Sequence, residues 1–186
     1  TLQIGPNVIN TVVTAQDGTT TGTYTVTVTR AASSDATLSN LTISAGTLTP
    51  VFASGTTSYT AGVDNATTSL TVTPTVNDAT ATVTVNGVAV VSGIASAAIP
   101  LVVGPNVITT VVTAQDGTTT GTYTVTVTRA PSASASLSNL VISSGTLTPV
   151  FDTATANYTA DVTNTTTSIT VTPTTSDAAA TVTVNG

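Results

Sequence analysis

The stretch GPNVINTVVTAQDGTTTGTYTVTVTRA at residues 5–31 decides the fold, because it returns at residues 104–130 with the single change of Asn10 to Thr109. The same offset of 99 residues carries LSNLTISAGTLTPVF (38–52) onto LSNLVISSGTLTPVF (137–151). A period of about 100 residues exceeds the roughly 20–50 residues of a solenoid unit and suits one small domain. The sequence therefore predicts a tandem array of domains that repeat every 99 residues.

This period sets the expected domain boundaries. Residues 32–130 form one complete repeat, residues 1–31 correspond to the C-terminal strands of a preceding repeat, and residues 131–186 to the N-terminal strands of a following one. Two arrangements fit: the sequence is a window of a longer tandem chain, or segments 131–186 and 1–31 of different subunits complete one sandwich in a head-to-tail polymer. In both arrangements the end segments of an isolated chain would expose unpaired strand edges, and such edges recruit partners.

The composition favours an all-β fold. Threonine accounts for 50 of the 186 residues, whereas charged residues make up only 5%. Thr and Val are β-branched and suit a pleated surface better than a helix. Because apolar residues alternate regularly with Thr, we expect sheets that have one buried face and one face covered by hydroxyl groups.

Charge and side-chain inventory exclude several classes of function. The net charge is −6 and the basic residues are Arg30 and Arg129, so the sequence offers little to neutralise nucleic-acid phosphates or an anionic membrane. No apolar run reaches 18 residues, and membrane insertion is not expected. Without His, Cys, Lys or Glu, Asp is the remaining ordinary general base, and the eight Asp residues are scattered. We therefore expect no enzyme activity, no catalytic residues and no cofactor.

Short runs of alternating apolar residues predict seven to nine strands in the complete repeat, which is typical of an Ig-like β-sandwich. Asn86-Gly87 is the residue pair that favours a two-residue type I′ hairpin turn. Asp116-Gly117, like Asp17-Gly18, begins a longer hairpin connection. The expected strands lie at about 36–43, 47–52, 58–63, 69–76, 81–85, 88–92, 98–103, 106–114 and 122–129.

The alternation also predicts which side chains are buried. In the last strand of the repeat Tyr123, Val125 and Val127 share the face that we expect to point inward, and Tyr24, Val26 and Val28 repeat that pattern. The other predicted core residues of the complete repeat are Leu38, Leu41, Ile43, Phe52, Tyr59, Leu70, Val72, Val83, Val85, Ile108, Val112 and Ala114.

Two segments of the repeat resemble a known family. The opening LSNLTIS…GTLTPVF…YTAGV (38–63) and the closing NVITTVVTAQDGTTTGTYTVTVTR (106–129) are similar to the bacterial cadherin-like β-sandwich repeat, an Ig-like module found in tandem on secreted and cell-surface proteins. The resemblance covers essentially the whole repeat. It implies an antiparallel β-sandwich and a spacer, stalk or adhesive role, and it implies no catalytic site.

Candidate sites are few. Cadherins bind calcium through acidic clusters between domains, whereas Asp35 stands alone in the first linker and the second linker has no acid. Asp64-Asn65, Asn77-Asp78 and Asp177 offer one or two carboxylates each, where calcium usually takes six to eight oxygen ligands, so we expect loop residues and no metal site. The Asn-x-Thr sequons at Asn40, Asn65, Asn157 and Asn164 are expected by chance in a threonine-rich chain.

In each copy of the repeat, a row of outward-facing threonines runs along the last strand. Three interpretations apply to them: a solvated strand face, a set of O-glycan acceptors, or a flat hydroxyl array of the kind that resembles ice-binding surfaces. The first is the simplest, because Thr supplies β-propensity without charge. The rows consist of Thr23, Thr25, Thr27 and Thr29, and of Thr122, Thr124, Thr126 and Thr128.

The sequence thus predicts a structural protein: a subunit or spacer repeat of an extracellular bacterial fibre, stalk or surface filament that assembles head-to-tail with its own kind. The alternative is an adhesin module that recognises a surface glycan or a host or surface protein through the turns at Asp64-Asn65 and Asn86-Gly87. Both place the chain outside the cell or on its surface.

Overall fold

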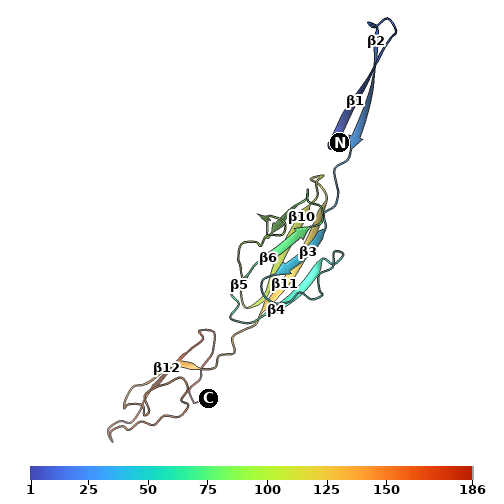
Figure 1. Cartoon of the computed structure of the whole chain (residues 1–186). Helices are drawn as coiled ribbons and strands as arrows, with labels where there is room; N and C mark the ends of the chain where they lie inside the picture. The colour runs from blue at the N-terminus through green and yellow to red at the C-terminus, as the bar shows by residue number, and fades with distance from the viewer. Residues whose placement is uncertain (186) are drawn as a thin grey trace. The chain divides into compact units, whose positions relative to one another are not determined.

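The computed structural model describes residues 1–185, so Gly186, the last residue of the expected third segment, lies outside the described part. The chain divides into two units, one ending at Pro131 and the other beginning at Ser132. Strands, turns and loops account for all of the described secondary structure (Figure 1). No helix long and apolar enough to cross a membrane occurs in residues 1–185.

The central sandwich is built on the alternating segment that defines the repeat. β10 (Gly104–Thr113) and β11 (Thr120–Arg129) pair antiparallel over ten residues each, from Gly104 opposite Arg129 to Thr113 opposite Thr120. The Asp116 carboxylate accepts hydrogen bonds from the amides of Thr118 and Thr119, both at 2.8 Å, and so fixes the connection. Asp at this position is favoured because its side chain bonds to the backbone of the same turn.

Three further strands join this hairpin in a five-stranded sheet of order β4-β11-β10-β7-β8. β7 and β8 pair antiparallel, which agrees with the antiparallel sandwich that we expected, whereas β4 runs parallel to β11 and makes this sheet mixed. A parallel neighbour requires a crossover connection, and here the chain passes through the opposite layer between β4 and β11. The added strands are β4 (Ser58–Val63), β7 (Thr82–Val85) and β8 (Val88–Val90).

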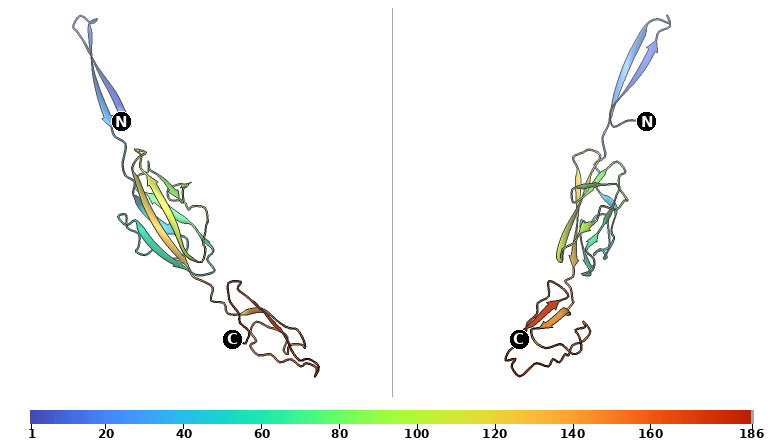
Figure 2. Two further views of the ribbon diagram at one scale, coloured as in Figure 1. Left: turned by 180° about the vertical axis from the view of Figure 1, so that it is seen from behind. Right: turned by 90° about the vertical axis from the view of Figure 1, so that its left-hand side faces the viewer.

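The second layer faces one side of this sheet, as the right-hand view of Figure 2 shows. It consists of two short antiparallel pairs, β3 with β6 and β5 with β9. The register of the first pair shifts between Leu38 and Asn40, which marks a bulge in β3. These strands are β3 (Leu38–Ile43), β5 (Ser69–Leu70), β6 (Val72–Val76) and β9 (Ile99–Pro100).

The core between the two layers confirms most of the predicted inward positions. Leu38, Val112 and Val125 are fully buried, as are Val72 and Val127. Ile43 and Phe52 are only partly buried and pack against the edge of this cluster. The Tyr123 hydroxyl lies within the core and accepts a hydrogen bond from the Leu38 amide at 3.0 Å, which ties the first strand of the repeat to the last.

One polar side chain interrupts the core. Thr110 is 1% exposed, and its Oγ1 has no hydrogen-bond partner among residues 1–185. A buried hydroxyl without a partner keeps its desolvation penalty.

Replacing Thr110 with the isosteric valine is therefore expected to raise the free energy of unfolding by about 1 kcal/mol. Thermal unfolding measures the change; Thr11→Val, at the equivalent exposed position, serves as the control, and a destabilised Thr110→Val variant would contradict the expectation.

Two local predictions have opposite outcomes. Asn86 and Gly87 both have positive φ, 48° and 81°, and join β7 to β8 with Val85 opposite Val88, which confirms the tight hairpin. The strand expected at 47–52 is wrong, since this segment makes only an isolated bridge between Thr49 and Thr60. Pro50 has no amide hydrogen to continue a ladder there.

The N-terminal segment is a hairpin of β1 (Gly5–Thr14) and β2 (Thr21–Arg30), with the same register as β10 and β11: Gly5 lies opposite Arg30. Within the described residues these two strands pair with each other and with no third strand.

The C-terminal unit contains β12 (Leu137–Ile142) and β13 (Val171–Thr175), which pair antiparallel like β3 and β6, down to the same register shift. Residues 157–162 and 181–184, the equivalents of β4 and β7, form no strand here beyond an isolated bridge from Thr159 to Thr148.

Candidate functional site

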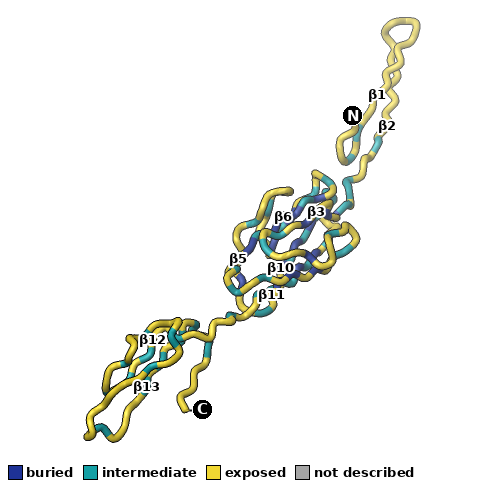
Figure 3. The backbone as a smooth tube through the Cα atoms, turned by 60° about the horizontal axis from the view of Figure 1, so that its bottom comes forward, coloured by how far each residue is buried: buried dark blue, intermediate teal, exposed yellow. Residues whose placement is uncertain are grey.

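The N-terminal hairpin exposes the face that its duplicate buries, although the two sequences are almost identical. Tyr24 is 67% exposed and its equivalent Tyr123 only 2%, and Ile9 is 50% exposed against 1% for Ile108. The face that alternation predicts to point inward, with Tyr24 and Val26, is thus left uncovered by the other described residues of the chain. In Figure 3 the hairpin is drawn almost wholly as exposed, whereas the central strands carry the buried positions.

The difference in exposure between the two copies is confined to one face. Val8, on the opposite face of β1, is 63% exposed, and its equivalent Val107 is also 63% exposed. The difference thus arises from side chains that a second layer covers in the central sandwich. Contiguous exposed apolar faces are uncommon on monomeric proteins and make this face the candidate interaction surface. Its members on β1 and β2 are Ile9, Val13, Tyr24 and Val26.

Both edges of the hairpin are also free within the described residues. In the central sandwich β4 occupies the outer edge of β11, with the Thr124 amide donating to the Thr57 carbonyl at 2.8 Å, and β7 occupies the outer edge of β10. β1 and β2 have no such neighbours. Free strand edges present unpaired amides and carbonyls that form a template for another strand.

The segment that leads into β3 approaches the hairpin at a glycine. A side chain at Gly121 in β11 would overlap the Ala36 carbonyl oxygen, whereas at Gly22 the nearest atom to an added Cβ is Tyr24 Cε2 at 3.9 Å. Sequence reasoning missed this contact. The signal was present, because a glycine inside a strand pattern often marks the close approach of another backbone.

An arginine side chain at the end of each hairpin binds backbone carbonyls. Arg129 donates from Nε and Nη2 to the Asn65 carbonyl, at 2.9 and 2.6 Å, and from Nη1 to the Leu101 carbonyl at 3.0 Å. Arg30 retains one of these bonds, from Nη1 to the Leu2 carbonyl at 3.1 Å. The remaining donors of Arg30 lie at an exposed strand end.

The C-terminal unit exposes the apolar side chains whose equivalents face the hairpin in the central sandwich. Val182 and Val184 are 46% and 49% exposed, whereas their equivalents Val83 and Val85 are each 3% exposed. Ile169, which corresponds to the buried Leu70, is 49% exposed. Residues 157–162 and 181–184, the equivalents of the two strands that pair with the hairpin in the central sandwich, are among the segments that form no strand in this unit.

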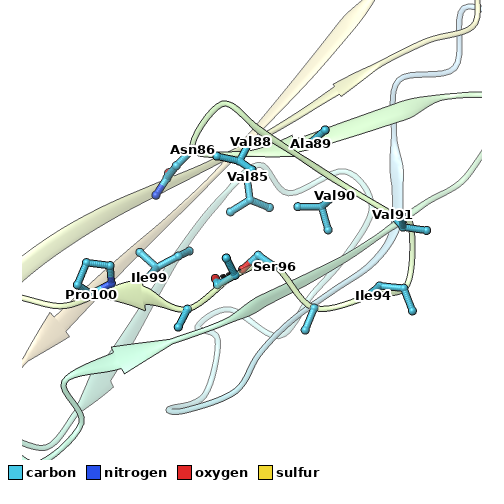
Figure 4. Close-up of a pocket in the computed structure, with 13 residues that line it drawn as sticks. Val85, Asn86, Val88, Ala89, Val90, Val91, Ile94, Ser96, Ile99 and Pro100 are labelled. Carbon is cyan, nitrogen blue, oxygen red and sulfur yellow. Dashed lines mark hydrogen bonds between the residues drawn. The ribbon is translucent and has the colours of Figure 1, made fainter.

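A groove of about 410 Å³ lies on the central sandwich between β8 and β9. Figure 4 shows the aliphatic side chains of Val88, Val90 and Ile99 along it. Its polar groups are already engaged: the Ser96 hydroxyl donates to the Ala97 carbonyl at 2.8 Å, and the Asn86 side-chain oxygen accepts from the Thr109 amide at 2.9 Å. Sequence reasoning did not single out this surface, although the run of small aliphatic residues after Asn86-Gly87 could have suggested it.

The acidic loop residues hold their own turns. Asp64 accepts from the Thr67 amide and hydroxyl, and Asp78 accepts in the same way from Thr80. The structure brings Asn77 to Asp35, with the amide nitrogen donating to the carboxylate at 2.7 Å. Residues 1–185 contain no group of three acidic, His or Cys side chains arranged for a metal ion. Asp177 bonds to the Ala179 amide at 2.8 Å.

These bonds lower the pKa of the carboxyl groups. The Thr119 hydroxyl and the neighbouring amides lower the pKa of Asp116 to about 2 from an ordinary 3.8, and the Thr20 hydroxyl does the same for Asp17. For Asp78 the Ser33 side chain has the largest effect and the pKa is again about 2.

A depressed folded-state pKa gives a defined acid sensitivity. Because each carboxyl binds its proton more weakly when folded than when unfolded, its stabilisation is complete above about pH 4 and is lost as the pH falls towards 2. We expect the Tm to be level from pH 7 to 5 and to fall between pH 4 and 2. Asp116→Asn should flatten part of that fall, and a Tm that stays level down to pH 2 would contradict the expectation.

The other sequence candidates lie on the surface. Thr122 and Thr128 are exposed and Thr124 and Thr126 half-buried, while all four threonines of the row in β2 are exposed. Of the sequon residues, Asn40, Asn157 and Asn164 are exposed, and Asn65 is half-buried with its amide bonded to the Ala130 carbonyl at 3.1 Å.

Two layers of strands, a repeated hairpin and hydrogen-bonded turns define the class as an Ig-like all-β module. The sequence matches the family described as the Cadherin-like beta sandwich domain over residues 1–31, 38–130 and 137–186, and the chain belongs to that family. The three matched segments begin and end close to the repeat boundaries.

A protein of Evansella cellulosilytica named "Putative membrane protein" is similar to part of the chain. It is 46% identical over 98 residues, which is 53% of this chain and 15% of that protein. The chain thus corresponds to a small part of the length of that relative.

Proposed function

We propose that the chain is a structural, non-catalytic spacer repeat of an extracellular bacterial fibre, stalk or surface filament, and that its units join head-to-tail. The observation that carries the proposal is the near-identical duplication of one sandwich-forming segment, buried in one copy and exposed in the other. Membership of a cadherin-like family supports a module displayed outside the cell or on its surface. The work of such a module is to supply length and to resist degradation.

The chemistry of the surface supports this role. The sequence contains two basic residues, so trypsin-like proteases have few sites, and Arg129 is held by three hydrogen bonds. The carboxylates are engaged in turns, and the threonine rows supply strand propensity without charge.

Arrays of different repeat number test the proposal. Strands of about ten residues at 3.3 Å each, with a short linker, should lengthen the particle by about 35–45 Å for each added 99-residue repeat. Small-angle scattering from two, four and six repeats measures that step. A radius of gyration that grows only as for a compact globule would contradict the spacer role.

An adhesin module is the second candidate, and the aliphatic groove beside β8 favours it. Its occupant would be an apolar segment of a surface protein, with the turns at Asp64-Asn65 and Asn86-Gly87 available to a glycan. Glycan and surface-protein arrays probed with the chain and with Ile94→Asp, which places a charge at a 59% exposed groove position, test this function. The adhesin function requires binding that the chain shows and the variant loses.

A further inference from the structure

We propose that the exposed face and both edges of the β1–β2 hairpin are a docking site for residues 132–185 of a second copy of this chain. The inference rests on the proposed function and deepens it, because it names the partner and the register of the head-to-tail joint. The occupied form of the site is visible inside the chain, where residues 32–85 cover the β10–β11 hairpin.

The two halves of the joint match position by position. β1 and β2 repeat β10 and β11 with one substitution in 27 residues, and the buried residues of β4 and β7 that face the hairpin are repeated one period later, although Ser58 and Gly62 become Asn157 and Asp161. Ala36, Leu38 and Tyr59 recur as Ala135, Leu137 and Tyr158. Each half has surplus apolar surface, and each lacks the strands that the other supplies.

The internal interface fixes the expected register. Because Val125 lies opposite Tyr59 and Val127 opposite Ala61, Val26 should lie opposite Tyr158 of the second copy and Val28 opposite its Ala160. Transposing the bond between the Leu38 amide and Tyr123 predicts that the Leu137 amide donates to the Tyr24 hydroxyl.

The chain itself argues for this occupant. Residues 32–85 are already engaged by β10 and β11, whereas segments 157–162 and 181–184 form no strand. Residues 132–185 carry three carboxylates and no basic side chain. In the proposed register the Asn164 carbonyl of the second copy is the equivalent of the Asn65 carbonyl, so it would accept from Arg30 the bonds that Arg129 makes in the central sandwich.

Cysteine cross-linking tests the register, since the chain has no cysteine of its own. Thr126 and Thr60 are opposite each other on neighbouring strands, a separation that a disulfide can bridge, and their equivalents are Thr27 and Thr159. We expect a mixture of the full-length Thr27→Cys and Thr159→Cys chains to yield, on mild oxidation, a product of twice the 18.2 kDa chain mass. The yield should be at least tenfold above that of either chain alone.

A glycine variant separates docking from random collision. Gly22→Val leaves the hairpin free of clashes, yet in the joint its side chain would overlap the Ala135 carbonyl, as a side chain at Gly121 would overlap that of Ala36. Added to the Thr27→Cys chain, it should abolish the mixed product. The exposed, nearly isosteric change Thr23→Val should leave the product unchanged.

Three outcomes would overturn the inference. The first is that the two cysteine chains form no mixed disulfide product. The second is that Thr23→Cys gives the same yield of mixed product as Thr27→Cys, and the third is that Gly22→Val does not reduce that yield. If cross-linking fails while longer arrays still grow by about 35–45 Å per repeat, the spacer function stands and the hairpin is completed by other sequence. If the array fails to lengthen, the spacer function itself is wrong.

Discussion

Replacing Ile108 with alanine is expected to lower the free energy of unfolding of the central sandwich by about 2–5 kcal/mol. Ile108 is 1% exposed and lies between the two layers, so the truncation removes buried methyl groups and leaves a cavity. Ile9 stands in an almost identical stretch of sequence and is 50% exposed. In dilute solution Ile9→Ala should therefore change the same free energy by no more than about 0.5 kcal/mol.

Urea unfolding followed by circular dichroism, at low chain concentration, measures the two variants side by side. The comparison isolates burial, because local sequence and strand position are shared. An equal loss for both variants in the dilute chain would mean that the N-terminal hairpin has a core of its own, contrary to the structure.

Replacing Gly121 with valine is expected to cost about 3 kcal/mol. Strand propensity alone predicts the opposite sign, since valine favours β-strands and glycine weakens them. The backbone of Ala36 decides the outcome, because its carbonyl oxygen occupies the space that a side chain at Gly121 needs. The segment that leads into β3 would have to move away from β11.

The matched control is Gly22→Val, where no atom other than Tyr24 Cε2 lies within 4 Å of an added Cβ. In the dilute chain this variant should be neutral or slightly stabilising. Calorimetry of the two variants provides the measurement, and a Gly121→Val protein that is as stable as the unchanged chain would refute the close approach.

Much of the fold could be predicted from particular residues. Alternation of Tyr123, Val125 and Val127 with threonine placed the inner face of β11, and Asn86-Gly87 placed the hairpin between β7 and β8. Both are local signals with a direct physical cause. The parallel neighbour of β11 was not predictable, since the choice of edge partner depends on how distant segments pack.

The candidate site was predictable in kind and not in detail. The 99-residue period indicated that the end segments would expose unpaired edges. It did not indicate that Tyr24 would be 67% exposed, because alternation defines the two faces of a strand and cannot tell whether a second layer is present to cover one of them. For the same reason residues 157–162 have strand-like sequence and form no strand: a strand needs a partner.

Sedimentation of the intact 186-residue chain over a wide range of concentration tests most directly whether the exposed hairpin face joins one copy to the next. The account predicts a weight-average mass that starts near 18.2 kDa and rises steadily with concentration, together with a Gly22→Val chain that remains near 18.2 kDa throughout. A mass that stays at the monomer value at every concentration, or an equal rise for the Gly22→Val chain, would contradict it.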